Sequence, residues 1–154
     1  MRFKKILRPW CGWMAVVCFL LTFTGLAAQA KDLKFEARLI WATHAQKSPD
    51  PNHKPVTAEV RKKLEALPLK WANYFEVSRK NLAVPRGGSE QVTLSDQCRM
   101  GVKDVKGEYI EVSQIGKGVP VLKLTQRLPK GEMLVLSGNA PDATGWLVVL
   151  KRVE

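Results

Sequence analysis

The two histidines are the first side chains to consider for chemistry, because imidazole binds metals and transfers protons near neutral pH. His44 and His53 lie in the stretch WATHAQKSPDPNHKPVTAEV, with eight residues between them. A zinc site needs a third and usually a fourth ligand. Asp50 lies beside the pair, but Asp96 or Cys98 would have to come from a distant part of the chain. The spacing therefore predicts no metal site, and we expect no cofactor.

Ser89 and Cys98 are the residues that a histidine could activate as nucleophiles. Ser89 follows an Arg-Gly-Gly turn, and the sequence has no G-x-S-x-G elbow. Cys98 occupies an inward position of a predicted strand, where cysteine is usually a small buried hydrophobic residue. A small hydrolase or metalloprotein that uses His44, His53 or Cys98 is therefore our third hypothesis, and we predict no catalytic residue.

A basic helix face is the sharper candidate for binding. In VTAEVRKKLEAL the apolar residues recur every three or four positions, which predicts a helix whose opposite face is basic. A solvated surface usually explains such charges, and contact with an anionic surface is the alternative. The strand that follows adds one cation and one aromatic ring to this surface. The predicted binding residues are Arg61, Lys62, Lys63, Lys70 and Tyr74.

The tryptophans suggest a second kind of binding site. Trp41, Trp71 and Trp146 follow the first thirty residues, and a flat ring exposed on a β-sandwich can stack on a sugar. Core packing is the simpler interpretation of Trp71 and Trp146, because both lie within apolar strand patterns. The same alternation in KWANYFEV places Phe75 inward and leaves Tyr74 as the remaining aromatic. Nucleic-acid surfaces need several exposed rings among their charges, so we expect no nucleic-acid partner.

Apolar and polar residues alternate in the segments that must position these side chains. Residues 33–41 alternate in this way, which predicts a strand with one buried face. Three prolines in QKSPDPNHKP then predict a loop, and a short helix follows from Thr57, its expected N-cap, to Pro68. From Leu69 onward, turn signals recur about every eight to twelve residues, which is typical of a sandwich or an open barrel.

We therefore expect a mainly β fold: an antiparallel β-sandwich of about seven to eight strands with one short α-helix after the first strand. The helix lies in a long first crossover, where it should cover an edge or an open end of the sheets. The last two strands, MLVLS and GWLVVLKRV, are nearly continuous apolar runs. Such runs predict central strands that are buried on both faces.

The first thirty residues are typical of a secretory signal peptide. Four basic residues precede a long uncharged run, which ends in Ala28-Gln29-Ala30. An uncleaved segment that anchors the protein in the membrane is the alternative, since the run is long enough to span a bilayer. We expect residues 1–30 to be removed and residues 31–154 to form a single β-sandwich-like domain.

Removal of that segment changes the charge and the cysteine content. Of the 25 Lys and Arg residues, 21 remain against 14 Asp and Glu residues, which leaves a net charge of +7. A soluble surface is the simpler interpretation, because the charges are spread along the chain. Attraction to a polyanion such as phospholipid, wall polymer or nucleic acid is the alternative. Cys98 is then the one remaining cysteine, so no disulfide within the domain is expected.

The ordered strings KWANYFEV, LPKGEMLVL and GWLVVL resemble small exported bacterial proteins of uncharacterised function. The resemblance implies an exported single β-domain and no particular activity. We expect a non-enzymatic domain of the periplasm or cell envelope that binds another protein or an anionic envelope polymer. The alternative is a glycan-binding module that uses exposed tryptophan.

Overall fold

The computed structural model describes residues 31–140 and 142–154. The predicted signal peptide, residues 1–30, lies outside these residues, so its cleavage stays a prediction. The described part of the chain forms nine strands and one helix. In chain order these elements are β1 (Leu33–Thr43), β2 (Lys54–Pro55), α1 (Ala58–Glu65), β3 (Asn73–Val84), β4 (Ser89–Ser95), β5 (Cys98–Lys106), β6 (Tyr109–Gly116), β7 (Val119–Arg127), β8 (Met133–Asn139) and β9 (Gly145–Arg152).

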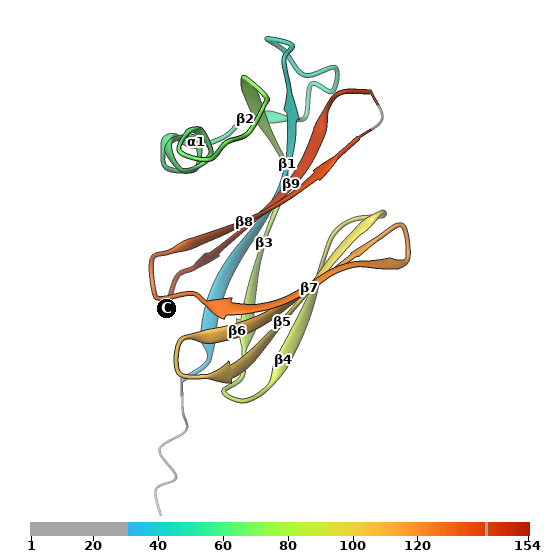
Figure 1. The fold of residues 1–154 in the computed structure, drawn as a ribbon. Helices are drawn as coiled ribbons and strands as arrows, with labels where there is room; N and C mark the ends of the chain where they lie inside the picture. The colour runs from blue at the N-terminus through green and yellow to red at the C-terminus, as the bar shows by residue number, and fades with distance from the viewer. Residues whose placement is uncertain (1–30, 141) are drawn as a thin grey trace, which may run out of the picture.

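The strands form two antiparallel sheets that face one another (Figure 1). Sheet A has the strand order β2-β3-β1-β9-β8, and sheet B has the order β4-β5-β6-β7. This arrangement confirms the predicted mainly β fold with one short helix after the first strand. The ninth strand, absent from the prediction, is the two-residue β2, which pairs with β3.

The space between the sheets holds the larger hydrophobic core. Leu33, Phe35, Ala37 and Leu39 alternate along β1 and pack there, as their period of two requires. The register of β1 against β3 shifts between Leu39 and Ile40, so a bulge lies at this point. Beyond it, residues on both faces of β1 are buried. The outer face of sheet A therefore needs a second apolar cover.

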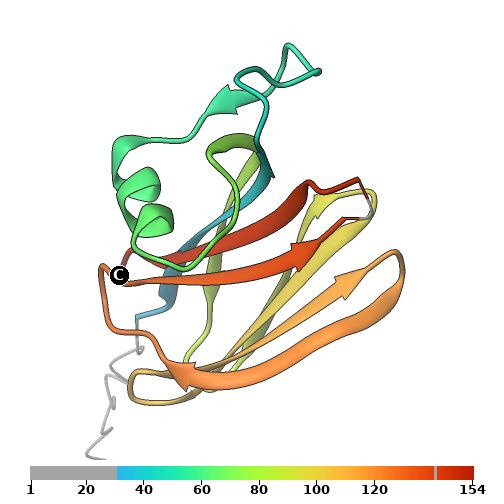
Figure 2. The same ribbon diagram turned by 45° about the horizontal axis from the view of Figure 1, so that its top comes forward.

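Helix α1 supplies that cover, which corrects the prediction that it would cap an edge or an open end. Figure 2 shows α1 against the face of sheet A that is turned away from sheet B. Val60 and Leu64 are buried there against a second cluster that includes Ile40 of β1. Thr57 is the N-cap residue as predicted, but its hydroxyl makes no cap hydrogen bond. It accepts a hydrogen bond from Nη1 of Arg38 at 3.0 Å instead.

The last two strands differ from one another. β9 lies between β1 and β8 and is buried on both faces, as its continuous apolar run predicts. β8 is an edge strand, so the prediction that it is central was wrong. Its apolar residues are nevertheless packed on both faces of the strand. Leu134 and Leu136 face sheet B, while Met133 and Val135 pack beside α1. Within the described residues, no helix has the length and apolar character needed to cross a membrane.

Candidate functional site

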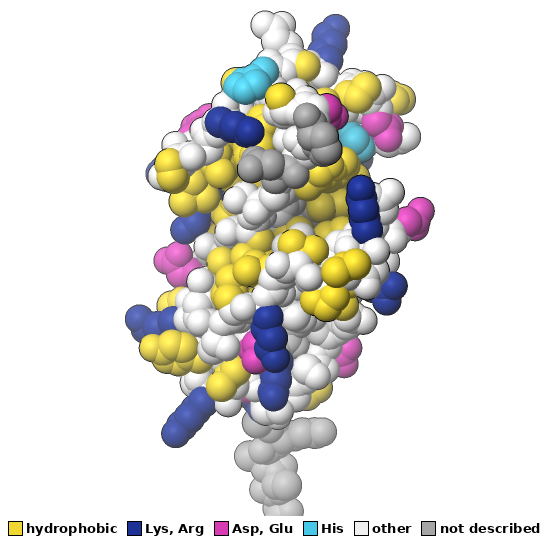
Figure 3. Space-filling view, turned by 45° about the vertical axis from the view of Figure 1, so that its right-hand side comes forward, with side chains coloured by type: hydrophobic (Ala, Val, Ile, Leu, Met, Phe, Trp, Pro, Cys, Tyr) yellow, Lys and Arg dark blue, Asp and Glu magenta, His cyan; other side chains and the backbone are white. Residues whose placement is uncertain are grey.

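The sheets part at one end and leave a cleft of about 640 Å³ between them, here called the inter-sheet cleft. In Figure 3, apolar side chains gather in a hollow across the middle of this face of the molecule. Sheet A and its β8–β9 hairpin provide one wall, and the turns of sheet B provide the other. The described lining residues are Leu39, Val77, Ser95, Asp96, Gln97, Cys98, Gln114, Gly116, Lys117, Val121, Gly138, Ala140 and Trp146.

A row of aromatic side chains leads into the inter-sheet cleft along sheet A. Phe75 of β3 pairs with Trp41 of β1, and Trp41 pairs with Trp146 of β9. Residues directly opposite one another on neighbouring strands share one face of a sheet, so the three rings form one aromatic row. The Trp41 and Phe75 ring centroids are 6.0 Å apart. Trp146 ends the row and is 41% exposed, although a ring in an apolar strand was expected in the core.

Glycine explains why the Trp146 ring is uncovered. Its partner on the edge strand β8 is Gly138, which has no side chain to lay over the ring. On the opposite wall, Val121 lies against Gly116 so closely that a Cβ there would be 2.8 Å from it. Val121 itself is 63% exposed. The cleft is therefore open because small residues stand where larger ones would fill it.

Cys98 lies on the wall that sheet B provides and is 8% exposed. Burial raises the pKa of its thiol, and a weak hydrogen bond from the Gln114 amide, 4.0 Å from the sulfur, opposes that shift. The thiol is therefore protonated near neutral pH. The burial of this small side chain was predicted from the sequence, and its place on the wall of the cleft was not.

Polar and charged groups of the cleft come from sheet B, at its two turns and at Ser95 of β4 and Gln114 of β6. The amide of Lys117 donates a hydrogen bond to the carbonyl of Gln97 at 2.8 Å, which ties the β6–β7 turn to the β4–β5 turn. Lys117 has a φ of 50°, a left-handed conformation that is uncommon for a residue with a side chain. Its ammonium group and the Asp96 carboxylate are the charges among the described lining residues.

The basic helix surface lies elsewhere, because α1 covers the opposite face of sheet A. We use this name for Arg61, Lys62, Lys63 and Lys70. Lys63 is 3.9 Å from a carboxylate oxygen of Glu132, and the Lys70 ammonium lies 5.2 Å from the centre of the Trp71 ring. In residues 31–140 and 142–154, no ion pair joins Arg61 or Lys62 to an acidic group.

Tyr74 does not belong to that surface. Its side chain is 3% exposed and packs in the cluster beneath α1. The hydroxyl donates a hydrogen bond to the carbonyl of Trp71 at 2.9 Å, and burial raises its pKa, with a smaller contribution from Glu65. Alternation placed Tyr74 on the outer face correctly, but α1 covers that face. Its ring is not accessible to a partner in this structure.

The histidines form no shared site. Nδ1 of His53 lies 2.8 Å from the Ser48 hydroxyl, and Nε2 lies 3.5 Å from a carboxylate oxygen of Asp50. These contacts join residues of one loop, and the His53 ring packs 6.2 Å from the Trp41 ring. His44 is exposed, and Asn73 donates a hydrogen bond to its carbonyl group. Across the part of the chain that is described, no three His, Cys, Asp or Glu side chains come together in a metal-binding group.

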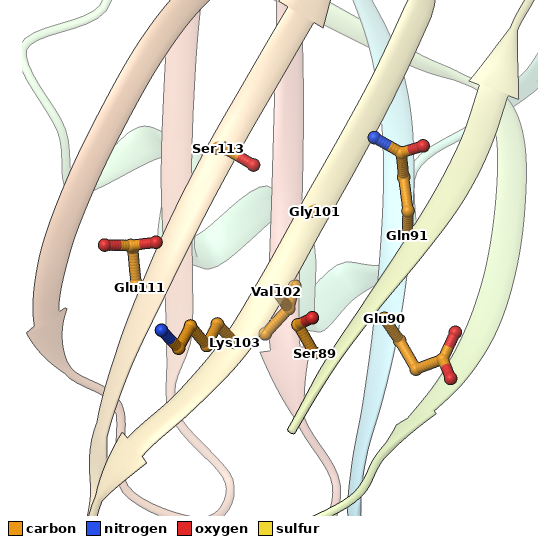
Figure 4. Close-up of a pocket in the computed structure, with 8 residues that line it drawn as sticks. All are labelled: Ser89, Glu90, Gln91, Gly101, Val102, Lys103, Glu111 and Ser113. Carbon is orange, nitrogen blue, oxygen red and sulfur yellow. The ribbon is translucent and has the colours of Figure 1, made fainter. Parts of the chain in front are cut away.

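The outer face of sheet B carries a shallower depression of about 340 Å³. Gly101 creates it, because a Cβ at that position would lie 2.6 Å from the Ser113 hydroxyl. Figure 4 shows the surrounding side chains, which are polar or charged apart from Val102. Since no described aromatic ring lines the depression, it offers less apolar contact to a ligand than the inter-sheet cleft does.

Comparisons of the chain with protein-family models, with curated proteins and with solved structures found no match. The candidate site therefore rests on the geometry above. Sequence reasoning named Trp146 but did not foresee its exposure. One signal was available: Gly138 and Gly145 flank the last hairpin, and glycine in a strand often marks a missing side chain beside a large one.

Proposed function

We propose that this protein is an exported, non-enzymatic binding domain of the bacterial envelope, and that it takes its ligand in the inter-sheet cleft. The observation that carries the proposal is Trp146, a large ring 41% exposed at the mouth of an apolar cleft between two sheets. Concave apolar sites with a few polar groups at their edges are typical of ligand binding. The basic start of the sequence, followed by a long uncharged run, supports export.

The test uses 1-anilinonaphthalene-8-sulfonate, an apolar aromatic anion, titrated into protein purified from cells that have exported it. We expect saturable binding of one molecule per chain by calorimetry. Val121→Asn should weaken this binding about tenfold, because it replaces an apolar wall with an amide. The matched control is Val105→Asn, since Val105 is 48% exposed on sheet B but does not line the cleft. Equal affinity of the two variants would count against the proposed site.

A second candidate function uses the basic helix surface. Arg61 and Lys62 extend from α1 without an acidic partner among residues 31–140 and 142–154, which favours contact with an anionic envelope polymer or an acidic protein. Binding of vesicles that contain phosphatidylglycerol tests this candidate. The triple variant Arg61→Gln, Lys62→Gln and Lys63→Gln should release the protein, and unchanged binding would rule out this surface.

The glycan-binding alternative uses the aromatic row. Trp146 is exposed, which favours this alternative more than its apolar strand pattern did. A soluble wall oligosaccharide that stacks on the ring should change Trp146 emission, and the change should be absent in Trp146→Phe. The sheet-A wall beside the ring is nevertheless apolar, with Leu39 and Val77 among its residues.

A further inference from the structure

The sheet-A wall of the inter-sheet cleft disfavours a ligand rich in hydroxyl groups. Leu39 and Val77 on this wall offer no hydrogen bond to such a group, whereas the polar side chains of the cleft, such as Gln97 and Gln114, lie on the sheet-B wall. A hydroxyl that enters an apolar site without a partner loses its bonds to water, and this loss weakens binding. A hydrocarbon loses nothing comparable, because it gains by leaving water. The sheet-A wall therefore fits an acyl chain better than a sugar ring.

The aromatic row lengthens this apolar surface beyond the cleft. From Trp146 it continues across β1 and β3 through Trp41 and Phe75. Trp41 is half-buried and Phe75 is nearly covered, so Trp146 offers most of the accessible ring surface. A flexible chain can lie between the sheets and emerge over this ring.

Lys117 gives the cleft a place for a negative head group. The residue keeps a left-handed backbone at φ 50° between Gly116 and Gly118, a position where glycine or asparagine is usual. Its amide is already bonded to Gln97, so the ammonium group is what it offers a ligand. No ion pair joins this ammonium to an acid of the described residues. A carboxylate at the mouth would supply one.

The carboxylate of Asp96 would repel a negative head group, and this restricts where such a group can bind. It is the acid among the described lining residues, on the β4–β5 turn beside Gln97. No ion pair within 4.0 Å joins it to Lys117, so the two charges do not cancel by direct contact. An anionic ligand must bind near Lys117 and away from Asp96. Neutralising Lys117 should therefore weaken the binding of an anionic ligand, and neutralising Asp96 should strengthen it.

We propose that the ligand of the inter-sheet cleft is a single-chain fatty carboxylate, with its hydrocarbon between the two sheets and its head group at Lys117. This inference rests on the proposed function, because it names the ligand class of the same site. Its recognition needs only apolar burial and one charge contact. No covalent step is involved.

The first experiment is a chain-length series on the exported protein, measured by calorimetry below the micelle concentration of each probe. Octanoate, decanoate and dodecanoate are compared, with 1-anilinonaphthalene-8-sulfonate as the common competitor. Each added methylene should tighten binding about twofold to fourfold until the cleft is filled. Dodecan-1-ol, which has the same chain and no charge, should bind more weakly than dodecanoate at low salt.

Two substitutions locate the head group. Lys117→Gln keeps the stem of the side chain and should weaken dodecanoate about twofold to fivefold, with no change for dodecan-1-ol. Asp96→Asn should tighten dodecanoate by a similar factor. Lys103→Gln on the outer face of sheet B is the matched control and should change neither ligand. The effects of Lys117→Gln and Asp96→Asn should shrink at high salt, because screening weakens exposed charge contacts.

The outcomes separate this inference from the proposed function. If 1-anilinonaphthalene-8-sulfonate binds but the fatty carboxylates do not compete, the ligand class is wrong and the cleft is still a binding site. Competition by a wall oligosaccharide alone would overturn the acyl chain in favour of a glycan. Equal affinity for dodecanoate and dodecan-1-ol in every variant would overturn the head group at Lys117. If no probe binds, both proposals fail.

Discussion

The space between the two sheets is closed at one end and open at the other, although the strands have the same alternating pattern of apolar residues at both ends. At one end, Leu33 and Val84 are almost fully buried beside Ile110 and Val112 of sheet B. At the other end, Leu39 and Val77 form the floor of an open cleft. The pattern of inward-facing apolar residues continues along the strands from one end to the other. The two ends differ in the hydrogen bonds that join the sheets and in the size of the residues that line the space between them.

Hydrogen bonds tie the closed end from one sheet to the other. Nη1 of buried Arg152, on β9, donates to the carbonyl of Leu128, which follows β7, at 3.0 Å. The amide of Leu128 donates to the carbonyl of Glu108. At the open end, the bond from Lys117 to Gln97 joins two turns of sheet B to one another. One bond beside the cleft crosses to sheet A, from the hydroxyl of Ser78 on β3 to the carbonyl of Leu94 on β4 at 2.6 Å. The core therefore stops where small residues, Gly138 of β8 and Gly116 of β6, stand beside larger ones.

The largest effect is expected at the closed end. Phe35→Ala removes a ring that is 1% exposed and should lower the free energy of unfolding by about 3–5 kcal/mol. Trp146→Ala removes a larger ring that is 41% exposed at the open end and should lower it by less, about 1–2 kcal/mol. Urea denaturation of both variants measures the difference. Similar losses in the two variants would show that the cleft is part of the core.

Arg152→Leu should come next. Removing the guanidinium leaves the Leu128 carbonyl without its donor at a buried position, at a loss of about 1–3 kcal/mol in the free energy of unfolding. Arg99→Leu is the control, because Arg99 is exposed on β5 and has no ion pair in the described residues. Thermal unfolding of the two variants at one pH compares them. An unchanged melting temperature for Arg152→Leu would argue against a tie between the sheets.

Gly138→Leu is intended to fill the cleft at the open end, where Gly138 pairs with Trp146. A Cβ at Gly138 has its nearest neighbour, the Trp146 carbonyl oxygen, at 3.8 Å, so the backbone accepts it. The new side chain should cover the Trp146 ring, shift its emission to shorter wavelength and abolish binding of 1-anilinonaphthalene-8-sulfonate. Stability should change by less than about 1 kcal/mol. Retained binding together with the emission shift would place the ligand outside the cleft.

The smallest effect is a pH dependence at Cys98. Burial raises the pKa of the folded thiol above that of a free cysteine, about 8.5, so the folded state keeps this proton longer than the unfolded state does. The thiol therefore contributes stability below the unfolded pKa, and that contribution is lost as the pH rises through the folded pKa. Cys98→Ala should flatten this decline. Iodoacetamide should label the folded protein more slowly than a cysteine peptide at about pH 8, and an equal rate would contradict burial.

The sequence predicted the scaffold well because the scaffold follows short-range patterns. The period of two in residues 33–39 predicted β1, and the apolar run of β9 predicted a strand covered on both faces. The helix was predicted from its apolar stripe, with Val60 and Leu64 as its buried residues. What the patterns could not predict was which face of which sheet α1 would cover. That choice also decided the burial of Tyr74.

The candidate site was harder to predict, because it depends on what stands opposite each residue. An apolar strand pattern says that Trp146 faces inward, and it does share a face with Val148 and Leu150. Its exposure depends on Gly138, which only the register of β8 against β9 places beside it. The cleft also requires that the β6–β7 turn, which lies about twenty residues before Gly138 in the sequence, is separated in space from sheet A. Such distances are set by packing and leave no local pattern in the sequence.

The central claim is that the inter-sheet cleft is the binding site, and chemical-shift mapping tests it most directly. Isotope-labelled protein is titrated with dodecanoate below its micelle concentration, and backbone amide and indole signals are followed. The account predicts shifts confined to the cleft, at Leu39, Gln97, Gln114, Lys117 and the Trp146 indole, that saturate with one ligand per chain. Shifts centred on Arg61 and Lys62 of α1, with Trp146 unchanged, would contradict it.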